Sequence, residues 1–184
     1  MASGGYMRAV SSNPALRAVV TNGCTLTETV GRLLSAGCKV RQTEATTEIR
    51  ELAAHYGDAW NSQDLDAIMH LHTDDSVFVA HAAGSVPAEG REAVREAFAG
   101  YLALLPDINF AERALHAGAD HWVLESTMSG TVAQPIEVEG EALGQNGARV
   151  EIDCVDVIEV RDGLVASKQT YIDSLTMQRQ LGGV

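Results

Sequence analysis

The order of two sequence patterns constrains the fold of this chain most. Segments in which apolar residues recur every three or four positions, as in helices, precede segments in which they alternate with polar ones, as in strands. A helix over residues 43–61 is predicted by apolar residues at intervals of three and four, namely Ile49, Leu52, Ala53, Tyr56 and Trp60. Residues 65–73 predict a second helix with Asp64 as its N-cap. Residues 91–104 predict a third helix, which ends before Pro106.

Strands are predicted along most of the remaining chain. The expected strands are residues 76–81, 108–117, 121–131, 150–160 and 164–172. The last two are joined by Arg161-Asp162-Gly163, a tight turn with glycine where a positive φ is needed. The polar stretch 133–148 predicts a lid or a long hairpin tip, and residues 174–181 predict a last short helix. Helices followed by an antiparallel sheet are typical of the α+β class.

Composition and charge exclude several classes of function. With 184 residues and 46% hydrophobic residues, the chain is long and apolar enough for a globular domain with a buried core. The net charge of −12 argues against a nucleic-acid partner, because neutralising phosphates requires clustered Lys and Arg. We also expect no membrane partner, since no apolar run approaches the ~20 residues that span a bilayer.

The cysteines indicate a reducing compartment. Cys24, Cys38 and Cys154 are odd in number and widely spaced, and they form neither a metal-binding pattern nor a plausible disulfide framework. We therefore expect buried or incidental thiols, a cytoplasmic protein, and neither a metal nor a cofactor.

The N-terminal segment differs from the rest of the chain. Residues 1–42 carry a net charge of +4, whereas the remainder carries −16. This segment is rich in Ser, Thr and Gly and lacks a sustained amphipathic pattern. An Arg-rich, acid-poor N-terminus resembles a transit peptide. A mobile extension, or a start site placed too early with Met7 as a later candidate, is the simpler interpretation. We therefore assign residues 1–42 to an extension and residues 43–184 to the domain.

One strand carries a candidate functional group. In residues 150–160 one face is apolar except for Asp156. Neither Lys nor Arg lies on that face of the strand, so a buried Asp156 is expected to be protonated at neutral pH. The alternative is a surface carboxylate, which a bulge in the strand would produce by shifting the register.

Three stretches together resemble a known family. They are AWNSQDLDAIMHLHTDDSVFV, GREAVREAF and VDVIEVRDGLVASKQTYIDSLTMQRQLG. Their order and spacing over about residues 45–182 resemble the NTF2-like superfamily, in particular its SnoaL-like and ketosteroid-isomerase-like domains. This resemblance implies a cone of three N-terminal helices packed on a curved, mostly antiparallel sheet around one apolar pocket. The fold hosts both enzymes and non-catalytic binding proteins.

The ketosteroid-isomerase resemblance also implies roles for three residues. Tyr56 stands eight residues before Asp64, as the oxyanion-binding Tyr of those enzymes does, and Asp156 falls close to their protonated Asp. The base position holds Ala80, and the next residue, His81, is the alternative base. We therefore expect Tyr56, His81 and Asp156 as catalytic residues.

The resemblance also implies a ligand and an assembly. We expect a small hydrophobic ligand, with the following side chains at its site: Trp60, Phe78, Trp122, Tyr171 and Asp173. Asp173 is alternatively the N-cap of the last helix. The expected activity is isomerisation or aldol-type cyclisation of a hydrophobic carbonyl compound, and the alternative is a non-catalytic ligand-binding or protein-interaction module. Val155 and Val157 lie on the second face of their strand, where we expect a homodimer interface.

Overall fold

The computed structural model describes residues 26–82, 85–138, 141–144 and 147–182. Residues Gln42–Val184 form one compact unit, which is the part considered below. Helix α1 spans Leu26–Asn61, so it begins well before the predicted residue 43. Leu26, Val30, Leu33 and Leu34 also lie at the i, i+4, i+7 and i+8 positions of a helix, a spacing that the prediction did not include. The predictions for residues 1–25 lie outside the described residues.

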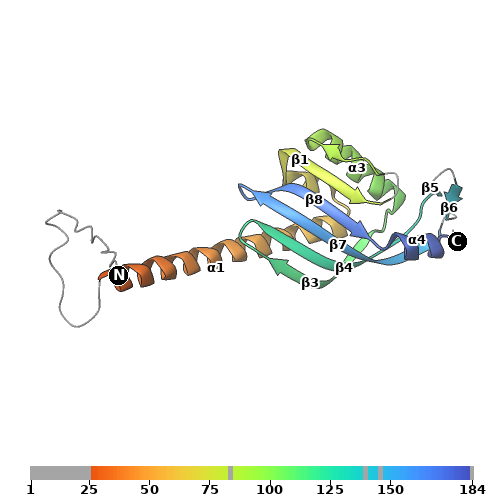
Figure 1. Cartoon of the computed structure of the whole chain (residues 1–184). Coiled ribbons are helices and arrows are strands. Elements are labelled where there is room, and N and C mark those ends of the chain that lie inside the picture. The colour runs from red at the N-terminus through yellow and green to blue at the C-terminus, as the bar shows by residue number, and fades with distance from the viewer. Residues whose placement is uncertain (1–25, 83–84, 139–140, 145–146, 183–184) are drawn as a thin grey trace, which may run out of the picture. The chain divides into compact units, whose positions relative to one another are not determined.

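A six-stranded sheet forms most of the compact unit (Figure 1). Its strand order is β2-β1-β8-β7-β4-β3, and all neighbours are antiparallel except β1 and β8. The strands are β1 (His72–His81), β2 (Ala88–Glu89), β3 (Asn109–Ala117), β4 (His121–Thr131), β7 (Arg149–Arg161) and β8 (Leu164–Ile172). The predicted α+β class and the mostly antiparallel sheet are therefore confirmed.

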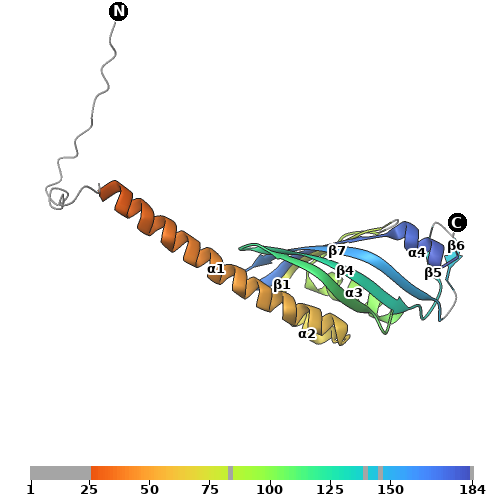
Figure 2. The same cartoon turned by 90° about the horizontal axis from the view of Figure 1, so that it is seen from below.

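Helices cover one face of this sheet (Figure 2). They are the part of α1 from Gln42 onward, α2 (Leu65–His70) and α3 (Arg91–Leu104). Asp64 caps α2 as predicted, because its carboxylate accepts a hydrogen bond from the Ala67 N–H. Helix α2 ends at His70 rather than at residue 73, since His72 and Thr73 already belong to β1.

Aromatic side chains fill the space between the helices and the sheet. Phe98 of α3 is fully buried and contacts Trp60 and Phe78 edge to face, with ring centroids 4.8 Å and 4.9 Å away. Trp122 and Ile158 close the core from the sheet side. The burial of Ile158 on β7 follows the predicted alternation, in which every second residue of the strand faces the core.

The polar stretch 133–148 contains a two-stranded hairpin, β5 (Ile136–Val138) and β6 (Glu141–Leu143). It is fixed to the C-terminal end of the chain, because the Gly144 N–H donates to the Leu181 carbonyl over 2.9 Å. Gly144 has a φ of +76°, and a Cβ there would lie 2.8 Å from the Leu181 side chain. This hairpin and the last helix, α4 (Ser174–Gln180), therefore close the same end of the sheet.

Two further sequence features can be compared with the structure. Cys154 is a buried free thiol, as expected, whereas the side chains of Cys24 and Cys38 lie outside the described residues. Within the described part of the chain, no helix is both long and apolar enough to cross a membrane.

Candidate functional site

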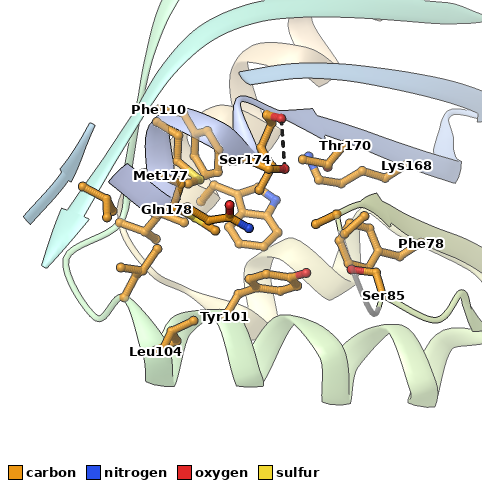
Figure 3. Close-up of a pocket in the computed structure, with 18 residues that line it drawn as sticks. Phe78, Ser85, Tyr101, Leu104, Phe110, Lys168, Thr170, Ser174, Met177 and Gln178 are labelled. Atoms are coloured by element: carbon orange, nitrogen blue, oxygen red, sulfur yellow. Dashed lines mark hydrogen bonds between the residues drawn. The ribbon is translucent and has the colours of Figure 1, made fainter. Parts of the chain in front are cut away.

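A cavity of about 200 Å³ opens between the helices and the sheet (Figure 3). Aromatic and thioether side chains form much of its wall: Trp60, Phe78, Tyr101, Phe110, Met128 and Met177. Five polar side chains also line it: Ser85, Lys168, Thr170, Ser174 and Gln178. A mostly apolar cavity with a few polar groups is the usual form of a small-molecule site.

Lys168 and Asp156 form a buried ion pair beside this cavity. The Lys168 ammonium lies 2.6 Å from the Asp156 carboxylate, with side-chain exposures of 4% and 5%. The Thr170 hydroxyl donates to the other Asp156 oxygen over 2.5 Å. Lys168 and Thr170 line the main cavity, whereas Asp156 lies behind them. The pocket therefore meets the pair through the lysine amine.

Three aromatic rings surround the Lys168 amine. Its nitrogen lies 5.7 Å from the ring centre of Tyr56, 5.6 Å from that of Trp60 and 5.9 Å from that of Phe110. Ring faces attract a cation, so these contacts stabilise the buried ammonium together with Asp156. In Figure 3 the Lys168 side chain extends from β8 into the cavity.

A smaller cavity of about 20 Å³ lies behind Lys168 and is lined by Tyr56, Asp156 and Trp122 among other residues. The Tyr56 hydroxyl shares a hydrogen bond with His72 Nε2 over 2.9 Å. Tyr56 is therefore next to the ion pair, as its predicted role requires, but it faces this inner cavity rather than the main one.

Burial keeps both partners of the Tyr56–His72 hydrogen bond neutral. Loss of water contact raises the pKa of the Tyr56 phenol well above its usual value; the Trp60 side chain acts in the opposite direction. Burial, together with the cations of Lys168 and Arg91, lowers the pKa of the His72 imidazole to about 3. The neutral Tyr56–His72 pair thus lies next to the ion pair, with the Tyr56 ring centre 5.7 Å from the Lys168 nitrogen.

The predicted ligand-contacting residues divide between the two faces of the sheet. Trp60 and Phe78 line the main cavity, and Trp122 is buried at the inner one. Tyr171 is instead 44% exposed on the opposite face of the sheet. Asp173 caps α4, because its carboxylate accepts a hydrogen bond from the Thr176 N–H. Neither Tyr171 nor Asp173 lines either cavity.

The structure does not bring His81, the expected base, to the main cavity. Ala80 faces the main cavity, so the next residue along β1 faces away from it. The His81 ring stacks on Tyr171 with centroids 4.0 Å apart, and its Nε2 lies 3.2 Å from Gln169 Oε1. The His81 ring therefore lies on the face of β1 opposite the main cavity.

Lys168 is a candidate functional residue that the sequence analysis missed. The sequence analysis considered only cations on the strand of Asp156, whereas Lys168 comes from the neighbouring strand. The register of β7 and β8 shifts between Glu159 and Val160, so Asp156 pairs with Thr170. Without the shift, Gln169 would pair with Asp156 and Lys168 would point to the other face.

The described residues include no cluster of three or more His, Cys, Asp or Glu side chains suited to a metal ion.

Comparisons with known structures place the fold. A protein with a ketosteroid-isomerase-like fold from Catenulispora acidiphila, solved with trimethylamine, is 18% identical with a TM-score of 0.60; the match covers 73% of this chain and 94% of that one. A protein from Jannaschia sp. CCS1, assigned as a SnoaL-like polyketide cyclase, is 18% identical with a TM-score of 0.65, covering 76% and 94%. A phenazine-biosynthesis-related protein from Pseudomonas aeruginosa is 17% identical with a TM-score of 0.63, covering 77% and 90%.

Sequence comparison agrees with this placement. No curated protein sequence matches the chain significantly. The family profile described as the SnoaL-like domain matches residues 52–168, which is more than half of the chain and includes Tyr56, Asp156 and Lys168. The chain therefore belongs to the SnoaL-like domain family, with the NTF2-like fold of the ketosteroid isomerases.

Proposed function

We propose that the protein is an acid–base enzyme acting on a small hydrophobic carbonyl compound, by isomerisation or aldol-type cyclisation. The observation that carries this proposal is the buried Asp156–Lys168 pair at the wall of an otherwise mostly apolar cavity. The relation to proteins assigned as polyketide cyclases supports it, because cyclisation of a polyketide also proceeds through an enolate.

Lys168 takes the central role in this proposal. Its ammonium has three N–H donors, and one of them points to Asp156. A remaining donor can bind the carbonyl oxygen of a ligand in the cavity and stabilise the negative charge of the enolate. Asp156, which accepts a hydrogen bond from the Thr170 hydroxyl, holds the amine in place and can take a proton from it or return one.

The alternative is a protein that binds such a ligand without changing it. Most of the cavity wall is aromatic or aliphatic, which by itself suffices to hold an apolar molecule. The relative from Catenulispora acidiphila, solved with trimethylamine, shows that this fold accommodates a small ligand.

Exchange of the α-protons of 1-tetralone for deuterium, followed by NMR, tests the proposal. The wild-type protein should accelerate exchange, and Lys168→Met should lose on the order of a hundredfold of that acceleration, the usual effect of removing an oxyanion donor. Arg95→Met is the control, because it also removes a positive charge but from an exposed pair with Asp66 that does not line the cavity, and it should stay close to wild type. Binding of 1-tetralone without accelerated exchange would instead favour the non-catalytic alternative.

A further inference from the structure

Lysine is rare in this chain. The sequence contains eleven arginines and two lysines, Lys39 and Lys168. Lys168 is thus the single lysine of the compact unit, and its side chain is 4% exposed. Lysines are rarely buried unless they are paired. All other basic positions of this unit, histidines aside, hold arginine. Lys168 is therefore the exception among the basic residues of this unit.

Charge alone does not account for a lysine here. A guanidinium pairs with a carboxylate through two parallel hydrogen bonds and remains charged under all ordinary conditions. A lysine ammonium can instead give its proton to a neighbouring carboxylate and become a nucleophilic amine. Asp156 lies 2.6 Å from the Lys168 nitrogen, which is within reach for that transfer.

We propose that Lys168 forms an imine with an aldehyde or ketone bound in the main cavity. This inference rests on the proposed function, since it assumes the same class of carbonyl ligand. Its basis is that the single lysine of the compact unit has its amine at the cavity wall beside a carboxylate.

The proposed step balances without a further reactant. The Lys168 ammonium gives a proton to Asp156, and the free amine attacks the carbonyl carbon to form a C–N bond. The former carbonyl oxygen becomes a hydroxyl group by taking a proton from the nitrogen. Asp156 then returns its proton to this hydroxyl, which leaves as water, and the nitrogen lone pair forms the protonated imine.

The surroundings of Lys168 suit this product. The protonated imine carries the same single positive charge as the ammonium that it replaces. Asp156 and the ring faces of Tyr56, Trp60 and Phe110 can therefore stabilise it as they stabilise the ammonium. The carbon chain of the ligand would then extend into the cavity that Lys168 lines (Figure 3).

Reductive trapping tests this inference on the full-length protein. The protein is incubated with 2-naphthaldehyde and sodium cyanoborohydride, which reduces an imine to a stable secondary amine, and is then digested with trypsin. Because trypsin does not cut after an alkylated lysine, modification of Lys168 should give an uncut peptide of residues 162–179 carrying one adduct. Lys39 and the N-terminal amine serve as internal controls and should react far more slowly.

Two variants complete the experiment. Lys39→Arg should retain the adduct, whereas Lys168→Arg keeps the positive charge but should lose it. Modification of Lys39 or the N-terminal amine at the same rate as Lys168, or the absence of an adduct on Lys168, overturns the inference even if Lys168→Arg does not fold. If wild type still accelerates exchange of 1-tetralone protons while no adduct forms, the imine is refuted and the proposed function stands.

Discussion

The Lys168 nitrogen lies 2.6 Å from a carboxylate oxygen of Asp156, and both side chains are at most 5% exposed. The two residues come from adjacent strands, β8 and β7. Two charges removed from water cost several kcal/mol each, and mutual attraction offsets this cost only when both partners are present. The pair is therefore a point at which the fold is sensitive to a single substitution.

Loss of either partner should destabilise the protein strongly. Asp156→Asn leaves an unpaired buried ammonium and should lower the free energy of unfolding by about 3–5 kcal/mol. Lys168→Met leaves an unpaired buried carboxylate and should lower it by a similar amount. The double variant should lose much less than the sum of the two. Asp153→Asn is the control, because its exposed pair with Arg113 should contribute at most about 1 kcal/mol. Urea unfolding measures all four, and additive effects at Asp156 and Lys168 would show that they do not interact.

His72 should make the stability of the protein depend on pH. Its pKa is lowered to about 3 in the fold, against 6.5 for an exposed imidazole, so the unfolded chain takes up the proton first. The contribution of the neutral His72 to the free energy of unfolding is thus fully present above pH 6.5 and is lost as the pH falls toward 3. Between these two pKa values the free energy of unfolding should decrease by up to about 1.4 kcal/mol for each unit by which the pH falls.

Urea unfolding between pH 7 and pH 5 isolates this effect, because most carboxylates stay ionised there. His72→Gln should remove the slope while keeping a side chain able to bond the Tyr56 hydroxyl. An unchanged slope in this variant would assign the pH dependence to other groups.

The alternation of apolar and polar residues along the sequence predicted the strands better than it predicted the site. The alternation in β7 correctly places Asp156 on the buried face, because a strand turns successive side chains to opposite sides. The partner of Asp156 depends instead on the bulge between Glu159 and Val160, which alternation along β7 does not reveal. That one-residue shift places Lys168 at the cavity and Tyr171 on the far face.

His81 shows the same limit on the first strand. The family resemblance assigned Ala80 to the base position, and Ala80 faces the cavity. A neighbour in the sequence cannot replace it, because His81 must point to the other side of β1. The signal that could have identified Lys168 is its rarity, since it is one of two lysines in the chain.

The division of the chain at residue 42 remains a prediction. A shortened protein starting at Thr43 should unfold cooperatively with a melting temperature within a few degrees of the full chain. The reason is that residues Gln42–Val184 form a compact unit with a core and two cavities of its own. Differential scanning calorimetry of the two proteins measures this, and loss of the cooperative transition would show that the N-terminal segment belongs to the core.

The homodimer also remains a prediction, and the outer face of the sheet offers its interface. Val155 and Val157 are only partly buried there, and Tyr171 is 44% exposed. Directly paired residues of adjacent strands share a face, so Val155 lies beside Tyr171 in one partly apolar surface. We expect the wild-type protein to sediment as a dimer at micromolar concentration, since association would cover this surface.

Val157→Glu should shift that equilibrium to the monomer, because a buried interface would have to accommodate an unpaired carboxylate. Val86→Glu is the matched control: Val86 is 82% exposed and lies outside the sheet strands, so the same change there should leave the dimer intact. Sedimentation velocity distinguishes the two states. A wild-type monomer, or a dimer equally sensitive to both substitutions, would exclude the outer face of the sheet as the interface.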